Sequence, residues 1–231
     1  MEKITIDSFL SFVKEIDIFD LLVNHVVFRG QPVPGNLLPG VARKNNTTDT
    51  TSDEKKILEQ LRLQGASLLP YHDESDLGLL VRAQHFKLKT RLLDWTINPL
   101  VALYFACSDP GSSDVYVYAL IADNLLASNI YNDDPFKAAK TRVFQPRMNN
   151  ARIVAQHGWF TLHRYSRSTK MFVPLEMNSE IKKNLYEYRI PCSQKAQMLV
   201  SLDRLGINAK SLFPDFEGIC QHLNWQHNHL V

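Results

Sequence analysis

The sequence predicts an α+β fold: a twisted, mostly antiparallel sheet of short strands with helices packed on it. Apolar residues recur at helical spacing in several segments, and short runs of β-branched and aromatic residues stand between those segments. The helices and strands follow one another in an irregular order, and the strands are short. Both observations favour an antiparallel sheet.

The first hundred residues alternate helices, strands and one long loop. A polar cap region around Ser8 precedes the first helix, and a β-branched strand ends at Arg29-Gly30. The following segment is rich in proline and glycine, which excludes regular structure there. The segments expected are a helix at 8–23, a strand at 25–28, a loop at 32–46, helices at 54–69 and 76–85, and a strand at 91–95.

The remainder of the chain begins with a helix that we expect to be buried. Pro99 is tolerated at its start, and the residues up to Cys107 are apolar on every face. A turn follows at 109–113, and Gly206 is expected to stop a later helix. The segments expected are a strand at 115–121, an irregular segment at 122–150, strands at 151–162, 171–175 and 186–190, and helices at 193–205 and 215–224.

Composition places the chain among ordinary globular proteins. It has 231 residues, of which 45% are hydrophobic and 22% charged, and its length suits a single domain. We expect one domain over residues 1–231, with an N-terminal helical extension at 1–24 and a C-terminal helical segment at 193–231. The formal net charge of +2 does not suggest a nucleic-acid surface, so no nucleic-acid partner is expected.

Targeting and redox features favour a cytoplasmic protein. No signal peptide is recognised, and acidic and polar residues interrupt the most apolar early stretch, 16–28, so no membrane span is expected. The three cysteines are scattered, which suits reduced thiols. Cys220, His222, His227 and His229 resemble a zinc set by composition, but chance clustering near a chain end is the preferred interpretation, and no metal site is expected.

Polar residues embedded in apolar segments are the candidates for a site, because the familiar phosphate-loop, zinc-protease and hydrolase motifs are absent. Arg29 ends a strand and offers a rigid fork of donors for phosphate or carboxylate, and Gly30 lets backbone approach a ligand closely. Asp94 is the candidate acid or base, and His85 the candidate proton carrier. The further ligand-binding candidates are Gln31, Gln84, Arg91, Trp95, Thr96, Arg152 and Gln156.

Each of these residues also has a purely structural interpretation. Asp94 could pair with Arg29 or Arg91 inside the protein, His85 could cap a helix end, and Gln156 could be a satisfied core amide. The two local groups of basic residues, at 82–91 and 142–152, could form a pocket for a phosphorylated ligand or could be ordinary solvated charge.

Several segments, in order, resemble the FRG domain family. They are Phe28-Arg29-Gly30-Gln31, the segments 84–86 and 90–96, Ala102-Leu103-Tyr104-Phe105-Ala106, and the later segments 152–161 and 212–215. The resemblance extends from about residue 28 to residue 223. It implies an intracellular, mostly prokaryotic or phage-associated protein, with a bacterial or phage defence or effector setting, and it brings a residue pattern more than a mechanism.

A weaker resemblance links the chain to ADP-ribosyltransferases of the arginine-serine-glutamate type. A strand ending in aromatic-Arg-Gly is similar to their first motif, and Trp95-Thr96 stands at the hydroxyl-bearing position. Arg152 occupies the place of the glutamate of the last motif, and arginine cannot accept a hydrogen bond. The resemblance implies NAD as a ligand or substrate, and this departure puts the usual transfer reaction in doubt.

Two functions therefore stay open. The first is a nucleotide-handling enzyme or effector with Arg29 as the phosphate clamp. The second is a non-catalytic module that senses a nucleotide or a protein partner, which the absent glutamate and the lack of a recognised nucleophile favour.

Overall fold

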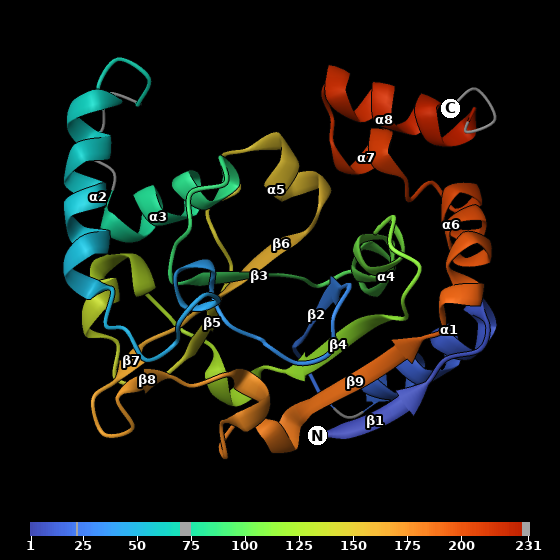
Figure 1. Cartoon of the computed structure of the whole chain (residues 1–231), viewed down its shortest axis with the longest axis horizontal. Helices are drawn as coiled ribbons and strands as arrows, with labels where there is room; N and C mark the ends of the chain where they lie inside the picture. Colours follow the sequence, from blue (N-terminus) through green and yellow to red (C-terminus); the bar gives the residue numbers. More distant parts are fainter. Residues whose placement is uncertain (22, 70–74, 228–231) are drawn as a thin grey trace.

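The computed structural model describes residues 1–21, 23–69 and 75–227, and within them the chain forms one large sheet and one small one (Figure 1). The large sheet has seven strands in the order β1-β9-β4-β2-β3-β6-β5, and every pairing is antiparallel except that of β1 with β9. The predicted α+β class and the mostly antiparallel sheet are confirmed. The strands of this sheet are β1 (Glu2–Thr5), β2 (Val26–Gln31), β3 (Leu92–Thr96), β4 (Val115–Ile121), β5 (Arg142–Phe144), β6 (Gly158–Leu162) and β9 (Leu185–Ile190).

Helices α2 and α3 lie at one side of the view and α6, α7 and α8 at the other, with α4 and α5 between them (Figure 1). Apolar side chains of α1, α4 and α6 pack on β2, β4 and β9, while α2 and α3 pack near β3 and β6. A small second sheet contains β7 (Tyr165–Ser166) and β8 (Met171–Phe172). The helices are α1 (Phe9–Asp17), α2 (Thr51–Gln64), α3 (Asp76–His85), α4 (Pro99–Cys107), α5 (Ala151–Ala155), α6 (Lys195–Arg204), α7 (Ala209–Leu212) and α8 (Phe216–Gln226).

The sheet is split between β2 and β3. β2 pairs with β4 at six successive positions, but it pairs with β3 only through Phe28 and Thr96. On its other side β3 pairs with β6 over all five of its residues. Beyond the single pair, the edges of β2 and β3 that face each other do not form a ladder. Backbone groups in this gap need other partners or a ligand.

Helix α4 explains the glycine of the Arg29-Gly30 segment. The helix is apolar on every face, as its sequence predicted, and it packs directly across β2. A Cβ atom added to Gly30 would lie 1.9 Å from the carbonyl oxygen of Ala102 and 2.6 Å from the backbone nitrogen of Ala106. Gly30 therefore allows close approach of a helix backbone, whereas the sequence suggested close approach of a ligand.

Several predicted element boundaries were wrong. The expected strand at 151–162 is two elements: helix α5, capped by the Asn150 side chain, and strand β6, which begins only at Gly158. Helix α2 ends at Gln64, before Gly65, and α1 passes into a 3-10 turn at Ile18–Leu21. Strand β1 was not predicted, because its four residues carry no strong β pattern of their own and are ordered by parallel pairing with β9.

None of the described helices combines the length and the apolar character that a membrane crossing requires.

Candidate functional site

A cavity of about 300 Å³ opens at the split between β2 and β3. Strands β2, β3 and β6 and helices α3, α4 and α5 contribute to its wall. The volume lies at the lower end of the range that small-molecule sites usually occupy. The lining residues are Phe28, Arg29, Gly30, His85, Asp94, Trp95, Thr96, Ala102, Phe105, Ile153, Gln156, Gly158, Trp159 and Phe160.

Arg29 bridges the split. Its Nη1 donates to the backbone carbonyl of Asp94 at 2.8 Å, and its Nε donates to Gln31 Oε1 at 3.1 Å. The arginine thus satisfies a carbonyl that β2 leaves without a ladder partner. No other described residue accepts a hydrogen bond from Nη2, so its two donors are available to a ligand. Burial lowers the pKa of Arg29 to about 10, with Asp94 acting in the opposite direction, and the side chain remains a cation at neutral pH.

Gln31 and Gln84 hold the two charged groups of the site in place. The amide nitrogen of Gln31 donates to the carbonyls of Val33 and Gly35, which fixes the oxygen that receives Arg29. Gln84 Nε2 donates to Asp94 Oδ2 at 3.0 Å, and its Oε1 accepts from the Thr90 hydroxyl at 2.7 Å. Neither amide lines the cavity, so both act through their neighbours.

Asp94 and His85 provide the titratable groups of the cavity besides Arg29. The Asp94 side chain is 56% exposed, and its Oδ2 lies 3.9 Å from Arg29 Nη1, which is a weak ion pair. Burial and then the positive charge of Arg152 lower the pKa of His85, while Asp94 raises it. The imidazole is therefore neutral at neutral pH and can accept or donate one proton.

A chain of buried hydrogen bonds fixes the Trp95 ring. Trp95 Nε1 donates to Thr161 Oγ1 at 3.0 Å, and that hydroxyl lies 2.9 Å from His163 Nε2. Burial, assisted by Arg29, Arg43 and Arg91, lowers the pKa of His163 to about 3. The imidazole is then neutral, and Thr161 Oγ1, which accepts from the indole, also shares a hydrogen bond with His163 Nε2 whose direction depends on the imidazole tautomer.

Trp159 stands opposite Trp95 in the register of β3 and β6. Its indole Nε1 is buried and finds no hydrogen-bond acceptor in the described part of the chain. A buried donor without a partner costs roughly 1–3 kcal/mol. Unpaired buried donors of this kind are rare in folded proteins.

Seven of the predicted site residues meet at this cavity. The gathered side chains come from segments up to 127 positions apart in the sequence, between Arg29 and Gln156. Gln156 also ties the site to the C-terminal helices, since its Nε2 donates to the Leu212 carbonyl at 3.1 Å. The seven are Arg29, Gly30, His85, Asp94, Trp95, Thr96 and Gln156.

The structure places Arg91 away from the cavity, which corrects its predicted position in a ligand site. Its side chain is 1% exposed and forms a two-pronged ion pair with Glu54, at 2.7 and 3.1 Å. Its guanidinium also lies over the Phe136 ring, 4.3 Å from the centroid. Arg91 therefore anchors α2 to the sheet, and the predicted basic pocket loses one member.

Arg152 also lies outside the cavity lining, and it lies on helix α5, where the resemblance to ADP-ribosyltransferases placed a strand. Its guanidinium binds the carboxylates of Asp215 and Glu217 and lies over the Phe213 ring. These contacts raise the pKa of Arg152 and fasten α7 and α8 to α5. Its influence on the site is limited to its charge near His85.

The sequence interpretation missed the apolar half of the cavity wall. Phe28, Phe105, Trp159 and Phe160 belong to the segments that carry the FRG resemblance, but they were not named among the site residues. Their position in that pattern beside Arg29 was the available signal.

The C-terminal histidines do not form a metal site in the part of the chain that the structure describes. There, no group of three or more histidine, cysteine or acidic side chains has the geometry to hold a metal ion. His229, one of the four residues considered, lies outside the described residues.

Comparison with protein families assigns residues 24–115 to the FRG domain. The matched segment contains Arg29, Gly30, His85 and Asp94, and it confirms the predicted resemblance over this part of the chain. Helix α5 and strand β6 lie beyond it. No curated protein and no solved structure matches the chain. The resemblance to ADP-ribosyltransferases and the extent of the single domain stay predictions.

Proposed function

We propose that the FRG domain of this chain binds a nucleotide or another phosphorylated small molecule, NAD-derived compounds among them, in the cavity between β2 and β3. The observation that carries this proposal is Arg29: a cation that is only 13% exposed, fixed by two hydrogen bonds, with two donors left toward the cavity. A phosphate oxygen pair matches the spacing of such donors.

Other lining groups suit the base and the sugar of such a ligand. Trp95, Trp159, Phe105 and Phe160 offer aromatic surface for a planar base. Asp94 repels a phosphate but accepts hydrogen bonds from sugar hydroxyls. We therefore expect the phosphate at Arg29 Nη2, on the side away from Asp94, and a sugar near the Asp94 carboxylate.

The binding test compares wild type with Arg29→Lys by calorimetric titration of NAD, ADP-ribose and the common mononucleotides. Lysine keeps the charge but loses the fork, so affinity should fall about 10- to 100-fold, which is the loss of one charge-assisted hydrogen bond. Arg167→Lys, at an exposed arginine that does not line the cavity, is the matched control and should bind as wild type does. Equal affinities of wild type and Arg29→Lys for every ligand would exclude Arg29 as the clamp.

A catalytic version of this function assigns roles to Asp94 and His85. Both line the cavity, and the neutral imidazole of His85 suits proton transfer at neutral pH. Incubation with NAD, followed by measurement of nicotinamide, tests this version. We expect release by wild type and a large decrease in Asp94→Asn; identical traces from wild type, Asp94→Asn and Arg29→Lys would rule it out.

The alternative is a non-catalytic module that senses a ligand or a protein partner. The occupation of Arg152 by Asp215 and Glu217 favours it, because no carboxylate stands where the transferases carry their glutamate. Ligand-induced thermal stabilisation without turnover would support sensing of a small molecule. If no nucleotide raised the thermal stability of the protein, recognition of a protein partner would remain as the alternative. A cytoplasmic, bacterial or phage defence setting accompanies either version of the proposal.

A further inference from the structure

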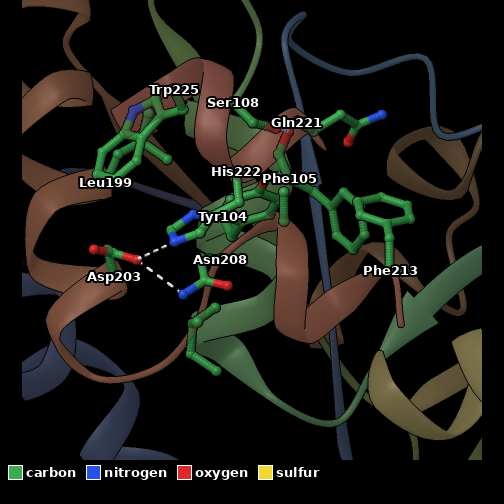
Figure 2. Close-up of a pocket in the computed structure, with 12 residues that line it drawn as sticks. Tyr104, Phe105, Ser108, Leu199, Asp203, Asn208, Phe213, Gln221, His222 and Trp225 are labelled. Carbon is green, nitrogen blue, oxygen red and sulfur yellow. Dashed lines mark hydrogen bonds and ion pairs between the residues drawn. The ribbon is translucent and has the colours of Figure 1, made fainter. Parts of the chain in front are cut away.

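A second cavity, of about 320 Å³, lies between α4, α6 and the pair α7–α8 (Figure 2). It is separate from the cavity at the sheet split, with which it shares only Phe105. Four aromatic residues form much of its wall: Tyr104, Phe105, Phe213 and Trp225. The remaining lining residues are Ser108, Leu199, Asp203, Ile207, Asn208, Ala209, Gln221 and His222.

Asp203 and His222 are the polar centre of this cavity. Asn208 Nδ2 donates to Asp203 Oδ1 at 2.8 Å, which fixes the carboxylate, and His222 Nε2 lies 3.7 Å from the same oxygen (Figure 2). That separation is too long for a hydrogen bond. The second oxygen, Oδ2, accepts no hydrogen bond from any described residue. One carboxylate oxygen is thus free to receive a donor.

His222 is a nine-tenths buried polar side chain without a hydrogen bond to any described residue. Its side chain is 10% exposed, and its ring lies parallel to the Trp225 indole, with 6.0 Å between centroids and 19° between planes. Buried imidazole nitrogens normally have a partner. The nitrogens of His222 are not among the fully enclosed unpartnered atoms of the described residues, and the side chain lines the cavity.

The charge of this lining distinguishes it from the first cavity. Asp203 is its only formally charged residue, whereas Arg29 dominates the site at the sheet split. An anionic group would therefore be repelled here. Aromatic walls with a free carboxylate oxygen and an imidazole favour a flat ring that carries N–H donors.

We propose that this cavity binds a planar aromatic group bearing an amino or amidine function, with its N–H donors on Asp203 and its ring among Tyr104, Phe105 and Trp225. A neutral nucleobase and a cationic aromatic amidine share this chemistry. The site is independent of the phosphate site around Arg29, and either can exist without the other.

The three tryptophans of the chain allow the two cavities to be observed separately. Trp95 and Trp159 line the first cavity, and Trp225 lines the second. In ¹H–¹⁵N spectra of the full chain, titration with adenine or with benzamidine should shift the Trp225 indole resonance in a saturable manner. A shift with adenine alone identifies a nucleobase site, and a shift with benzamidine alone identifies a cation site. The absence of a saturable Trp225 shift with both probes would overturn the proposal.

Asp203→Asn removes the charge while keeping an oxygen that can accept from Asn208. Benzamidine affinity should fall at least about tenfold, as for any lost charge-assisted hydrogen bond, and adenine affinity should fall less. Glu59→Gln, which removes the same charge from an exposed position on α2, should bind as wild type does. Equal affinities of wild type and Asp203→Asn for both probes would contradict the assigned contact.

Ser108→Leu provides a second variant that does not touch the buried polar pair. Ser108 is exposed and lies at the cavity edge, at the end of α4, so a larger side chain is tolerated and should obstruct entry. Loss of the Trp225 shift in Ser108→Leu, with the shift retained in Arg29→Lys, is expected. Loss in Arg29→Lys as well would overturn the independence of the two sites.

Discussion

At the scale of single residues, burial determines the charge of the side chains on which the site depends. Arg29 keeps its charge despite a lowered pKa, whereas His163, which is buried directly after β6, is held neutral. Thr161 Oγ1 hydrogen-bonds to His163 Nε2 and accepts from the Trp95 indole, so His163 is linked to the Trp95 ring. The wall of the cavity is therefore sensitive to acid through a residue that does not line it.

His163 should make the protein less stable in acid. Its ordinary pKa is 6.5 and its pKa in the folded protein is about 3, so between these values the unfolded chain binds a proton that the folded chain does not. The free energy of unfolding then falls as pH decreases below 6.5, by about 2 kcal/mol between pH 7 and pH 5. Urea unfolding between pH 7 and pH 5 should show this fall in the free energy of unfolding in wild type. In His163→Gln the fall should be smaller by about 2 kcal/mol, because the titrating imidazole is gone. Parallel curves would show that His163 is not the cause.

At the scale of elements, the fit of α4 on β2 fixes the geometry of the split. Gly30 allows the helix backbone to approach the strand, and apolar side chains of α4 pack on β2 in the same core cluster as Phe28. The same helix presents Phe105 to both cavities. Changes to this contact should therefore alter stability and both sites together.

Gly30→Ala should destabilise the protein by about 3 kcal/mol or more. The added methyl group would overlap the Ala102 carbonyl, and backbone on both sides must shift to make room. Gly206→Ala is the control: its φ of 81° strains an alanine, but nothing lies near the new methyl group, so the cost should be about 1 kcal/mol. Denaturant titration measures both, and equal losses would argue against the tight contact of α4 and β2.

At the scale of the whole molecule, the C-terminal helices are fastened to the site by a few polar contacts. Arg152 binds Asp215 and Glu217, and Gln156 binds the Leu212 carbonyl. The pKa of Asp215 is lowered by the Gly218 amide and by Arg152, so this connection weakens as the carboxylate is protonated in acid. These contacts join the helix that borders the first cavity to the helices that border the second.

Arg152→Met should loosen α7 and α8 with little effect on global stability. The ion pairs are exposed to solvent, so their loss should change the free energy of unfolding little. Amide hydrogen exchange within 209–226 should quicken, while exchange in β2, β3 and β4 stays unchanged. Arg167→Met should leave both regions as in wild type. Unchanged exchange in 209–226 would show that Arg152 does not fasten these helices.

The local features of this protein could be predicted from its sequence. Helix α3 and strand β4 were predicted with their observed ends, the buried character of α4 followed from its apolar run, and the FRG segment marked Arg29. These features depend on residues close together in the chain, whose spacing and side-chain type are visible in the sequence.

Only the tertiary structure decided which polar residues share a cavity. Arg29 and Arg91 have the same side-chain chemistry. Arg29 lines the cavity at the split, whereas Arg91 forms an ion pair with Glu54, 37 positions earlier in the chain. The second cavity arises where α4 meets α6 and α8. Of its polar residues the sequence interpretation considered only His222, as part of a zinc set that was not the preferred interpretation. Strand register and helix packing join segments that are far apart in the chain. The contacts between such segments stabilise the fold, but no local sequence pattern shows which segments will meet.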